Sequence, residues 1–332
     1  MAYKVAVLGA TGAVGREMLK VLEERNFPIS ELVPLASERS AGKLIDFAGE
    51  KLTIRKADEN AFAGMDIVLG AAEDEIAKAM APHIKKAGAV FIDNSHAFRM
   101  DKDVPLVVPE VNPEDVKWHN GLIANPNCVT IIAAVAVNPI AKLSPIKTMI
   151  AASYQSVSGA GIGGIRELDA QMAQLAKGEP ITETKAFAHQ IAMNVIPKVG
   201  SVKENGYSSE ELKLLNEGRK IMHLPEMQVS CTCVRVPVMR SHSIAINLST
   251  EKELSLEEVR AAMLAAPGVK LADEPNSEVY PMPLVTSDQD LVFVGRIRKD
   301  MALPNGIALW CCGDQIRKGA ATNAVQIAEL LK

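Results

Sequence analysis

The sequence predicts an α/β protein in two parts, with a mostly parallel sheet in the first part and an α+β arrangement in the second. Three observations carry this prediction. Short apolar segments alternate with helical patterns up to about residue 127, longer strand patterns follow, and the chain closes on one more amphipathic helical segment. The expected parts are residues 1–127, residues 128–313, and a C-terminal helix within 314–332 that packs back on the first part.

In the first part, the apolar runs predict strands at residues 5–8, 31–36, 52–55, 66–70 and 89–93. Helical patterns at residues 13–26 and 73–86 separate them, and a short strand at 122–123 precedes the next helix. Parallel strands need such crossover segments, because each strand must return to the same edge of the sheet before the next begins.

In the second part, strands are predicted at residues 149–157, 228–238 and 243–248, with helices at 165–176 and 208–222. Long strands of this kind can form an extended sheet. The last segment, 319–331, has the spacing of an amphipathic helix, with apolar residues at Val325, Ile327, Leu330 and Leu331.

Length and charge narrow the class of partners. The 332 residues suffice for about two hydrophobic cores, and a formal net charge of -4 argues against a nucleic-acid surface. The apolar stretch from Val129 ends at Asn138, too soon to span a bilayer. We therefore expect a cytoplasmic protein that acts on small molecules, without nucleic-acid or membrane partners.

A glycine-rich turn lies between the first strand and the first helix. Its sequence is Gly9-Ala10-Thr11-Gly12-Ala13-Val14-Gly15, with the spacing G-x-x-G-x-x-G. Backbone N–H groups of such a turn, together with the helix N-terminus, can hold a pyrophosphate. This arrangement predicts a Rossmann-like, dinucleotide-binding first domain, the alternative being an ordinary tight turn.

The segment after the second strand favours NADP over NAD. No acidic residue ends the apolar run, whereas Arg39 lies between Ser37 and Ser40 and suits a 2′-phosphate. Glu38 keeps NAD open, since its carboxylate could instead bind the ribose hydroxyl, and Arg39 could be a solvated surface charge.

Cys128 is the candidate nucleophile. It follows Asn125-Pro126-Asn127 at the expected start of a helix, where the helix dipole favours a thiolate. The alternative is a buried packing residue, and that is how we interpret Cys231, Cys233, Cys311 and Cys312, whose spacing fits neither a zinc pair nor a redox motif. We expect no metal and no disulfide scaffold.

His242, at a turn that opens a strand, is the candidate acid/base, because its ordinary pKa lies near neutrality. Arg99 and Arg235 are candidate anion ligands, since an arginine inside the apolar strand around Arg235 requires a polar partner. Glu217 and Lys220 lie three residues apart on one helix, so an exposed ion pair is their alternative interpretation.

Five segments together resemble the aspartate-β-semialdehyde dehydrogenase family. They are residues 9–15, 36–42, Asn125-Pro126-Asn127-Cys128, Ser158-Gly159-Ala160-Gly161 and Arg317-Lys318-Gly319-Ala320-Ala321. The resemblance runs essentially from end to end. It implies reduction of L-aspartyl-4-phosphate by NADPH, through a cysteine thioester, to L-aspartate-4-semialdehyde and phosphate. It also implies the route to lysine, threonine and methionine, and a homodimer.

The resemblance also assigns residues. Cys128 matches the thioester nucleophile, His242 the acid/base and Gln155 the glutamine that positions the substrate. Substrate contacts are implied for Arg235 at the α-carboxylate, Glu217 at the α-amino group, and Arg99, Asn127 and Lys220 at the phosphate. Implied or expected cofactor contacts are Gly9, Thr11, Gly12, Ala13, Val14, Ser37, Arg39, Ser40, Ser158, Gly159 and Gln315.

Three positions depart from the family pattern: Val129 where serine is common, Ile244 in place of an acidic residue or glutamine, and Gln315 in place of asparagine. Two other interpretations remain. N-acetylglutamyl-phosphate reductase shares the glycine loop and the cysteine, but its acetylated substrate has no use for a carboxylate such as Glu217. A non-catalytic NADPH-binding relative would have no need for the complete set of Cys128, Gln155, Arg235 and His242.

Overall fold

The structure, a computed structural model, describes residues 2–331. The chain forms two compact units. Unit 1 consists of the chain up to Asn127 together with the segment that begins at Gly319, and unit 2 is Cys128–Lys318. Residues 314–318 thus lie with unit 2, whereas the sequence placed them with the C-terminal helix.

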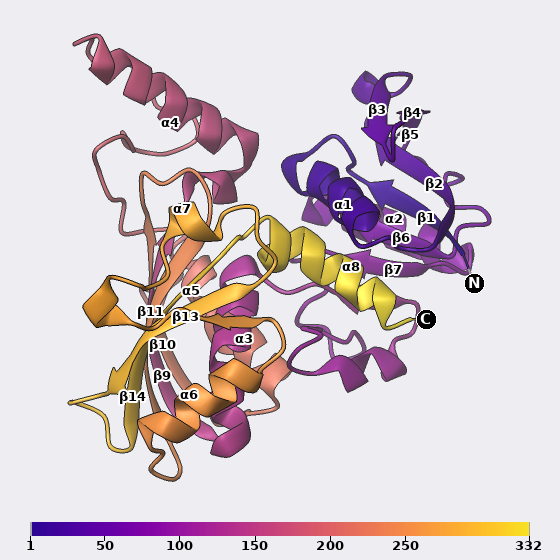
Figure 1. Cartoon of the computed structure of the whole chain (residues 1–332). Helices are drawn as coiled ribbons and strands as arrows, with labels where there is room; N and C mark the ends of the chain where they lie inside the picture. The colour runs from indigo at the N-terminus through magenta and orange to yellow at the C-terminus, as the bar shows by residue number, and fades with distance from the viewer. Residues whose placement is uncertain (1, 332) are drawn as a thin grey trace. The chain divides into compact units, whose positions relative to one another are not determined.

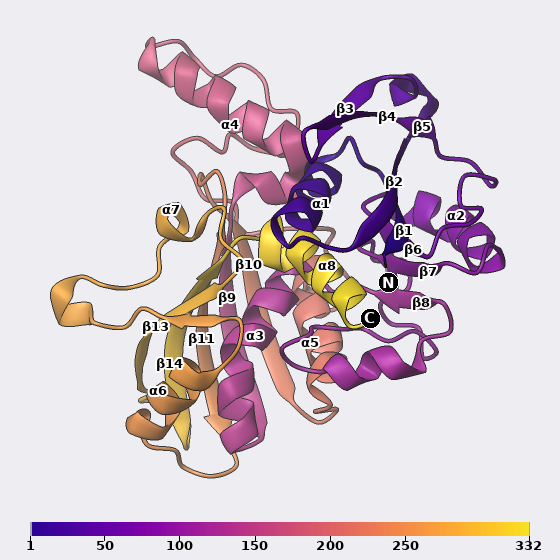
Figure 2. The same ribbon diagram turned by 45° about the vertical axis from the view of Figure 1, so that its right-hand side comes forward.

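Unit 1 is built on a six-stranded sheet with the order β5-β2-β1-β6-β7-β8, and every neighbouring pair is parallel. The sheet is visible in Figure 2, where β8 lies next to β7. The strand order reverses between β1 and β6, and in open parallel sheets ligands bind at the carboxyl edge beside such a reversal. The strand bounds are Tyr3–Leu8 (β1), Ile29–Ala36 (β2), Arg55–Lys56 (β5), Ile67–Gly70 (β6), Val90–Asp93 (β7) and Leu122–Ala124 (β8).

One predicted strand is wrong in its extent. The apolar stretch at residues 52–55 is divided between β4 (Glu50–Thr53), which pairs with β3 (Leu44–Phe47) in a separate hairpin, and β5 on the main sheet. Ile54 lies between them and is buried. The sequence showed the hydrophobic side chains but not the change of partner.

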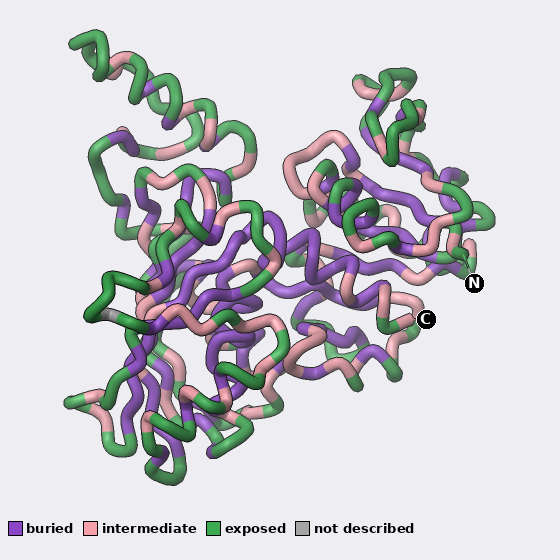
Figure 3. Tube along the Cα trace, viewed as in Figure 1, coloured by how far each residue is buried: buried purple, intermediate pink, exposed green. Residues whose placement is uncertain are grey.

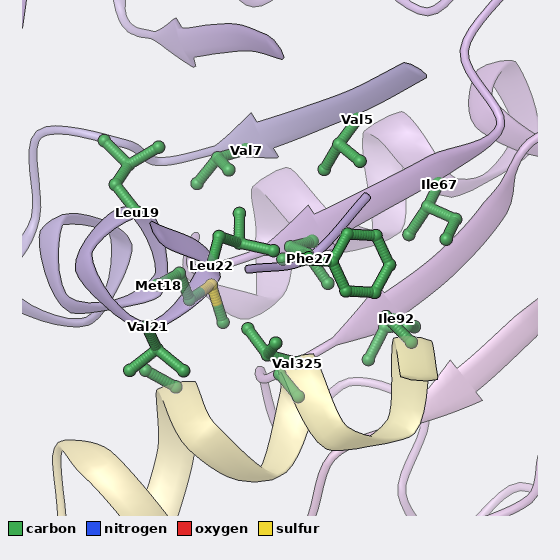
Figure 4. Close-up of a cluster of buried hydrophobic side chains, with 14 of the residues drawn as sticks. Val5, Val7, Met18, Leu19, Val21, Leu22, Phe27, Ile67, Ile92 and Val325 are labelled. Atoms are coloured by element: carbon green, nitrogen blue, oxygen red, sulfur yellow. The ribbon is translucent and has the colours of Figure 1, made fainter. Parts of the chain in front are cut away.

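Three helices belong to unit 1: α1 (Ala13–Glu24), α2 (Asp74–Lys86) and α8 (Thr322–Glu329). Figure 4 shows Val325 of α8 among Met18 and Leu22 of α1 and Phe27, all of them buried. An ion pair with two hydrogen bonds joins Arg25, at the end of α1, to Glu329. The predicted return of the C-terminal helix to the first domain is confirmed.

Unit 2 contains a second six-stranded sheet, with the order β10-β9-β11-β14-β13-β12. Pairs β10–β9 and β12–β13 are parallel, and β9–β11, β11–β14 and β14–β13 are antiparallel, so the sheet is mixed. Its strands are Ile146–Gln155 (β9), Gln228–Arg235 (β10), His242–Thr250 (β11), Val269–Leu271 (β12), Val292–Lys299 (β13) and Gly306–Gly313 (β14).

Helix α3 (Cys128–Leu143) packs on this sheet through contacts with β9, β11, β13 and β14. Helices α5 (Ser209–Met222) and α6 (Leu256–Ala265) both contact α3. Figure 1 shows α3 and α6 against the strands. Twelve of the sixteen residues of α3 are buried, and the central strands are also largely buried in Figure 3. Two further helices are α4 (Gly161–Ala176) and α7 (Pro283–Thr286). The predicted fold class, a Rossmann-like domain with an α+β second domain, is confirmed.

Candidate active site

The glycine loop closes the turn between β1 and α1. Gly9 has φ +86°, and a Cβ on it would lie 2.6 Å from the carbonyl oxygen of Ala71, after β6. A Cβ on Gly15 would lie 2.2 Å from the carbonyl oxygen of Gly9. Both positions therefore require glycine. The loop lies at the strand reversal with the N-terminus of α1 beside it, which is the geometry that holds a pyrophosphate.

Arg39 lies in the 3₁₀ turn Glu38–Ser40, after β2 and at the same edge of the sheet, and is exposed. The neighbouring carboxylate of Glu38 is also exposed and lies 3.0 Å from the ammonium group of Lys56 on β5. The residue that could have favoured NAD is thus engaged by a cation, while Arg39 extends from the same turn.

Arg99 is buried, and a network at the carboxyl ends of β7 and β8 holds its surroundings. Its Nη2 donates to the carbonyl oxygen of Asn94 at 2.9 Å. Asn125 donates to the Asn94 side chain at 2.7 Å and to the Ala320 carbonyl at 3.0 Å, and Asn323 donates to Asn125 at 2.6 Å. The motif around Asn125 does not predict these contacts, because the bonded partners lie far apart along the chain.

In the same network, Asp93 is fully buried and accepts two hydrogen bonds from Ser95. Burial raises the pKa of the Asp93 carboxyl, and the Ser95 bonds and Arg99 act against this rise. Asn127, the last residue of unit 1, is also buried and directly precedes the cysteine.

Cys128 is the first residue of α3 and is partly exposed, whereas the other four cysteines are buried. The peptide dipoles of the sixteen-residue helix favour a negative charge at this end. Arg235, the last residue of β10, lies close enough for a Cys128 thiolate to raise the pKa of its guanidinium, although burial, the larger effect, lowers it. The sulfur thus has two sources of positive potential.

The Arg235 side chain is buried, and other groups of the protein contact its guanidinium. Its Nη1 donates to the carbonyl oxygen of Ser156 at 2.6 Å, and its guanidinium carbon lies 5.7 Å from the ring centroid of Phe187. A Cβ on Gly159 would lie 2.8 Å from Nη1 of Arg235 and 3.2 Å from Nε2 of His242. Gly159 therefore lies where the polar ends of these two side chains meet.

His242, the first residue of β11, is fully buried. Its Nδ1 accepts a hydrogen bond from the backbone N–H of Ser156 at 3.1 Å, and the Ser156 hydroxyl lies 3.1 Å from the same nitrogen. Burial and, second, the charge of Arg235 lower the pKa of His242 well below its ordinary value. Its Nε2 has no hydrogen-bond partner among residues 2–331.

Gln155 ends β9, is buried, and pairs in register with Arg235 across the parallel β9–β10 ladder. Glu217 and Lys220 lie on α5, which packs against both β10 and α3. Glu217 is only 1% exposed, so the interpretation of this pair as an exposed ion pair is wrong. A buried carboxylate in this place needs polar or charged partners.

Unit 2 therefore brings Cys128, Gln155, Gly159, Arg235 and His242 onto neighbouring elements, together with the helix that carries Glu217 and Lys220. Ser158 and Gln315, expected at the cofactor, are joined by a hydrogen bond. Unit 1 contains the glycine loop, Ser37, Arg39, Ser40, Arg99 and Asn127. Sequence reasoning missed Ser156, although the serines at 156 and 158, directly after β9, were a visible signal.

Within residues 2–331, no group of three or more histidine, cysteine, aspartate or glutamate side chains is placed to hold a metal ion. In the same range, none of the helices combines the length and the apolar character that a transmembrane segment requires.

A glycine-loop nucleotide domain followed by a mixed-sheet domain with a cysteine at a helix start defines the class of semialdehyde dehydrogenases. Two family models agree: the semialdehyde dehydrogenase NAD-binding domain matches residues 4–119, and its dimerisation domain matches residues 137–318. Together they account for most of both units.

Individual relatives identify the family more closely. Aspartate-semialdehyde dehydrogenase of Aquifex aeolicus is 52% identical over 334 residues, covering 100% of this chain and 98% of the relative, and that of Bacillus subtilis is 46% identical. The structure of aspartate semialdehyde dehydrogenase II from Vibrio cholerae, complexed with ASA, superimposes with a TM-score of 0.97 at 44% identity, covering 100% and 98% of the two chains. The chain belongs to the aspartate-semialdehyde dehydrogenase family of oxidoreductases.

Proposed function

We propose that this enzyme reduces L-aspartyl-4-phosphate with NADPH to L-aspartate-4-semialdehyde and phosphate, through a thioester on Cys128, on the route to lysine, threonine and methionine. The observation that carries the proposal is the grouping of a cysteine at the N-terminus of α3 with a buried arginine and a buried histidine. Full-length similarity to aspartate-semialdehyde dehydrogenases supports the substrate.

The physical logic is that a carboxylate resists hydride, because it is already an anion. A thiolate that attacks the acyl phosphate expels phosphate and leaves a thioester, whose carbonyl can accept a hydride. The substrate carries a carboxylate and a phosphate, and the arginines and the lysine match these charges: Arg235 for the carboxylate, Arg99 and Lys220 with Asn127 for the phosphate. Glu217 would face the α-amino group, and Gln155 would position the acyl group.

The dinucleotide supplies the hydride, and the glycine loop with Arg39, Ser37 and Ser40 would hold it. We propose NADP as the cofactor, because Glu38 is paired with Lys56 while Arg39 is exposed at the carboxyl edge of the sheet. We also propose a homodimer, in keeping with the matched dimerisation domain, and a cytoplasmic location, where the five free thiols would stay reduced.

The test of the reaction is phosphate-dependent reduction of NADP with L-aspartate-4-semialdehyde, measured beside the N-acetylglutamate semialdehyde. We expect activity with the first aldehyde only. Cys128→Ala should abolish turnover and leave NADP binding unchanged, because the glycine loop lies in unit 1, with Cys231→Ala as the control for loss of a buried thiol. Preference for the acetylated aldehyde, or a Cys128→Ala enzyme that still turns over, would refute the proposal.

The cofactor preference has its own test. Arg39→Ser should raise the KM for NADPH about 10- to 100-fold, the value of a lost charged hydrogen bond to phosphate, and leave the KM for NADH unchanged. Lys51→Ser, at an exposed ion pair with Asp46 on the β3–β4 hairpin, is the matched control. An equal loss with both cofactors would show that Arg39 does not read the 2′-phosphate.

A further inference from the structure

Residues 185–196 follow α4 and lie outside the helices and strands, yet side chains of α4 hold this segment in place. Gln171, which is only 1% exposed, accepts the backbone N–H groups of Ile191 and Ala192 through its Oε1, both at 3.0 Å. Glu167, one helical turn earlier, accepts the backbone N–H of the first residue of the segment at 2.7 Å. Buried N–H groups need such acceptors, so these bonds fix the course of the segment.

The far end of the segment pairs with the strand that carries the arginine. The backbone N–H of Ile196 donates to the carbonyl oxygen of Arg235 at 2.9 Å, and the N–H of Arg235 donates back to Ile196 at 2.8 Å. The Ile196 side chain is buried in a small hydrophobic cluster with Val157 and Leu168, and the ring of Phe187 packs against this cluster. The position of Phe187 relative to β10 is therefore fixed.

The ring of Phe187 contacts α4 and Arg235. The guanidinium carbon of Arg235 lies over the ring, 5.7 Å from its centroid. A Cβ on Gly164 of α4 would lie 3.1 Å from Cζ of Phe187, so a glycine there leaves the ring its space. An aromatic face attracts a cation, most strongly where water is excluded, and Arg235 is only 6% exposed. The ring thus stabilises the charged side chain where little water reaches it.

Most of the Arg235 fork is left for a ligand. Nη1 donates to the carbonyl oxygen of Ser156 at 2.6 Å, and this is the only hydrogen bond of the side chain within residues 2–331. A guanidinium carries five N–H donors in one plane. A carboxylate can accept two of them at once, but only where the plane of the fork is held in the matching orientation.

We propose that Phe187 is a positioning residue for the substrate: its ring, presented by α4 and the segment 185–196, holds the guanidinium of Arg235 so that the unused N–H groups donate to both oxygens of the α-carboxylate. The proposal rests on the proposed function, in which Arg235 binds that carboxylate. It deepens this function, because it makes a segment remote from the glycine loop responsible for recognising the carboxylate.

The test is the kinetics of Phe187→Leu, which keeps an apolar side chain but loses the aromatic face. The KM for L-aspartate-4-semialdehyde should rise about 3- to 30-fold, the value of a cation–π contact between exposed and desolvated surroundings. The KM for phosphate and for NADP, and kcat, should stay within about twofold, because the lost contact serves only the binding of the carboxylate. Phe187→Tyr keeps the ring and should retain the wild-type KM.

Phe47→Leu is the matched control, because Phe47 is also a partly buried ring that packs on a hydrophobic cluster, in unit 1. It should leave the KM for the aldehyde unchanged. An unchanged KM for the aldehyde in Phe187→Leu would overturn the proposal. An equal rise in the KM for phosphate would overturn it as well, since it would indicate a general disturbance of the site, and so would a raised KM in Phe187→Tyr.

A second measurement follows Arg235 itself and needs no turnover. In enzyme labelled with ¹⁵N-arginine, the Nε–H resonance of Arg235 is identified by its absence in Arg235→Lys. This proton should exchange with solvent faster in Phe187→Leu than in the wild type, because the side chain is no longer held, and at the wild-type rate in Phe187→Tyr and Phe47→Leu. Equal exchange in Phe187→Leu and the wild type would overturn the proposal.

The two measurements separate this proposal from the proposed function. A wild-type enzyme that is inactive on L-aspartate-4-semialdehyde would refute the function, and the exchange rates would still decide whether Phe187 holds Arg235. Equal exchange rates in an active enzyme would refute the role of Phe187 alone.

Discussion

Gly159 shows how closely the reactive side chains are packed. The side chains of Arg235 and His242 extend to Gly159 from neighbouring segments. A Cβ on Gly159 would lie only 2.8 Å from Nη1 of Arg235 and 3.1 Å from Cε1 of His242, which is too close. The glycine was expected at the cofactor because of its motif. Its second property, the space that it leaves beside Nε2 of His242, depends on residues that lie 76 and 83 positions later in the sequence (235 − 159 and 242 − 159).

We therefore predict that Gly159→Ala lowers kcat/KM by about 10- to 100-fold, because the added methyl displaces two reactive groups by a fraction of an ångström or more. The protein should remain folded. Gly163→Ala is the control, since its Cβ would lie an ordinary 3.9 Å from the Cβ of Ala186. Wild-type kinetics in Gly159→Ala would contradict this close packing.

The buried imidazole also predicts a dependence of stability on pH. The pKa of His242 is lower in the folded protein than its ordinary value of 6.5, so the unfolded chain binds the proton more readily. Its contribution to the free energy of unfolding is complete above 6.5 and is lost as the pH falls through the lowered pKa. His242→Gln should lose less stability than the wild type upon acidification, measured by urea unfolding at several pH values. If the free energy of unfolding changed with pH equally in both proteins, His242 would not be the source of the pH dependence.

At the scale of elements, helix α5 is tied to the strand that carries Arg235. Ser208 and Glu211 form a capping box at its N-terminus, with the backbone N–H of Ser208 donating to Glu211 at 2.7 Å. The other carboxylate oxygen of Glu211 accepts the backbone N–H of Cys233, on β10, at 2.9 Å. One side chain thus begins the helix and also satisfies a donor of the neighbouring strand.

Glu211→Gln should lower the free energy of unfolding by more than the loss of an ordinary helix cap does. An amide has one acceptor oxygen, so either the Ser208 or the Cys233 N–H loses its partner, at about 1–3 kcal/mol for a part-buried group. The control is Glu258→Gln in the equivalent exposed capping box of α6, where Ser255 is the partner and about 1 kcal/mol or less is expected. Chemical unfolding measures both, and equal losses would contradict a tie between α5 and β10.

At the scale of the whole molecule, the chain leaves unit 1 at residue 127 and returns to it at residue 319. Helix α8 then completes the core beneath β1, β6 and β7 (Figure 4). The core of unit 1 is therefore not complete until α8 has been synthesised, although the strands of its sheet all lie within the first 124 residues.

Val325→Ala should destabilise unit 1 by about 2 kcal/mol, the cost of two buried methyl groups with the cavity that they leave. Affinity for NADP should fall under mildly denaturing conditions, because the glycine loop depends on the same core. Leu330→Ala, at a residue that is 39% exposed, is the control and should change little. Thermal unfolding followed with and without NADP gives both quantities, and an effect of Leu330→Ala equal to that of Val325→Ala would contradict this view.

The sequence by itself determined the local features: the parallel first sheet, the glycine turn, and a cysteine at the start of a helix. Hydrophobic periodicity and turn chemistry act over a few residues, so they can be read from neighbours along the chain. The misassigned segment at 52–55 shows the limit, because its two halves bond to different strands.

Only the tertiary structure decided which groups bond to one another. Ser156 and His242 are 86 residues apart, and Ser241 and Gln315 are 74 apart. No local pattern in the sequence predicts such pairs. A serine hydroxyl can donate to or accept from many groups, and the packing of the fold determines which of them lies within reach. The surroundings of His242 follow from those bonds, and its chemistry is therefore a property of the fold.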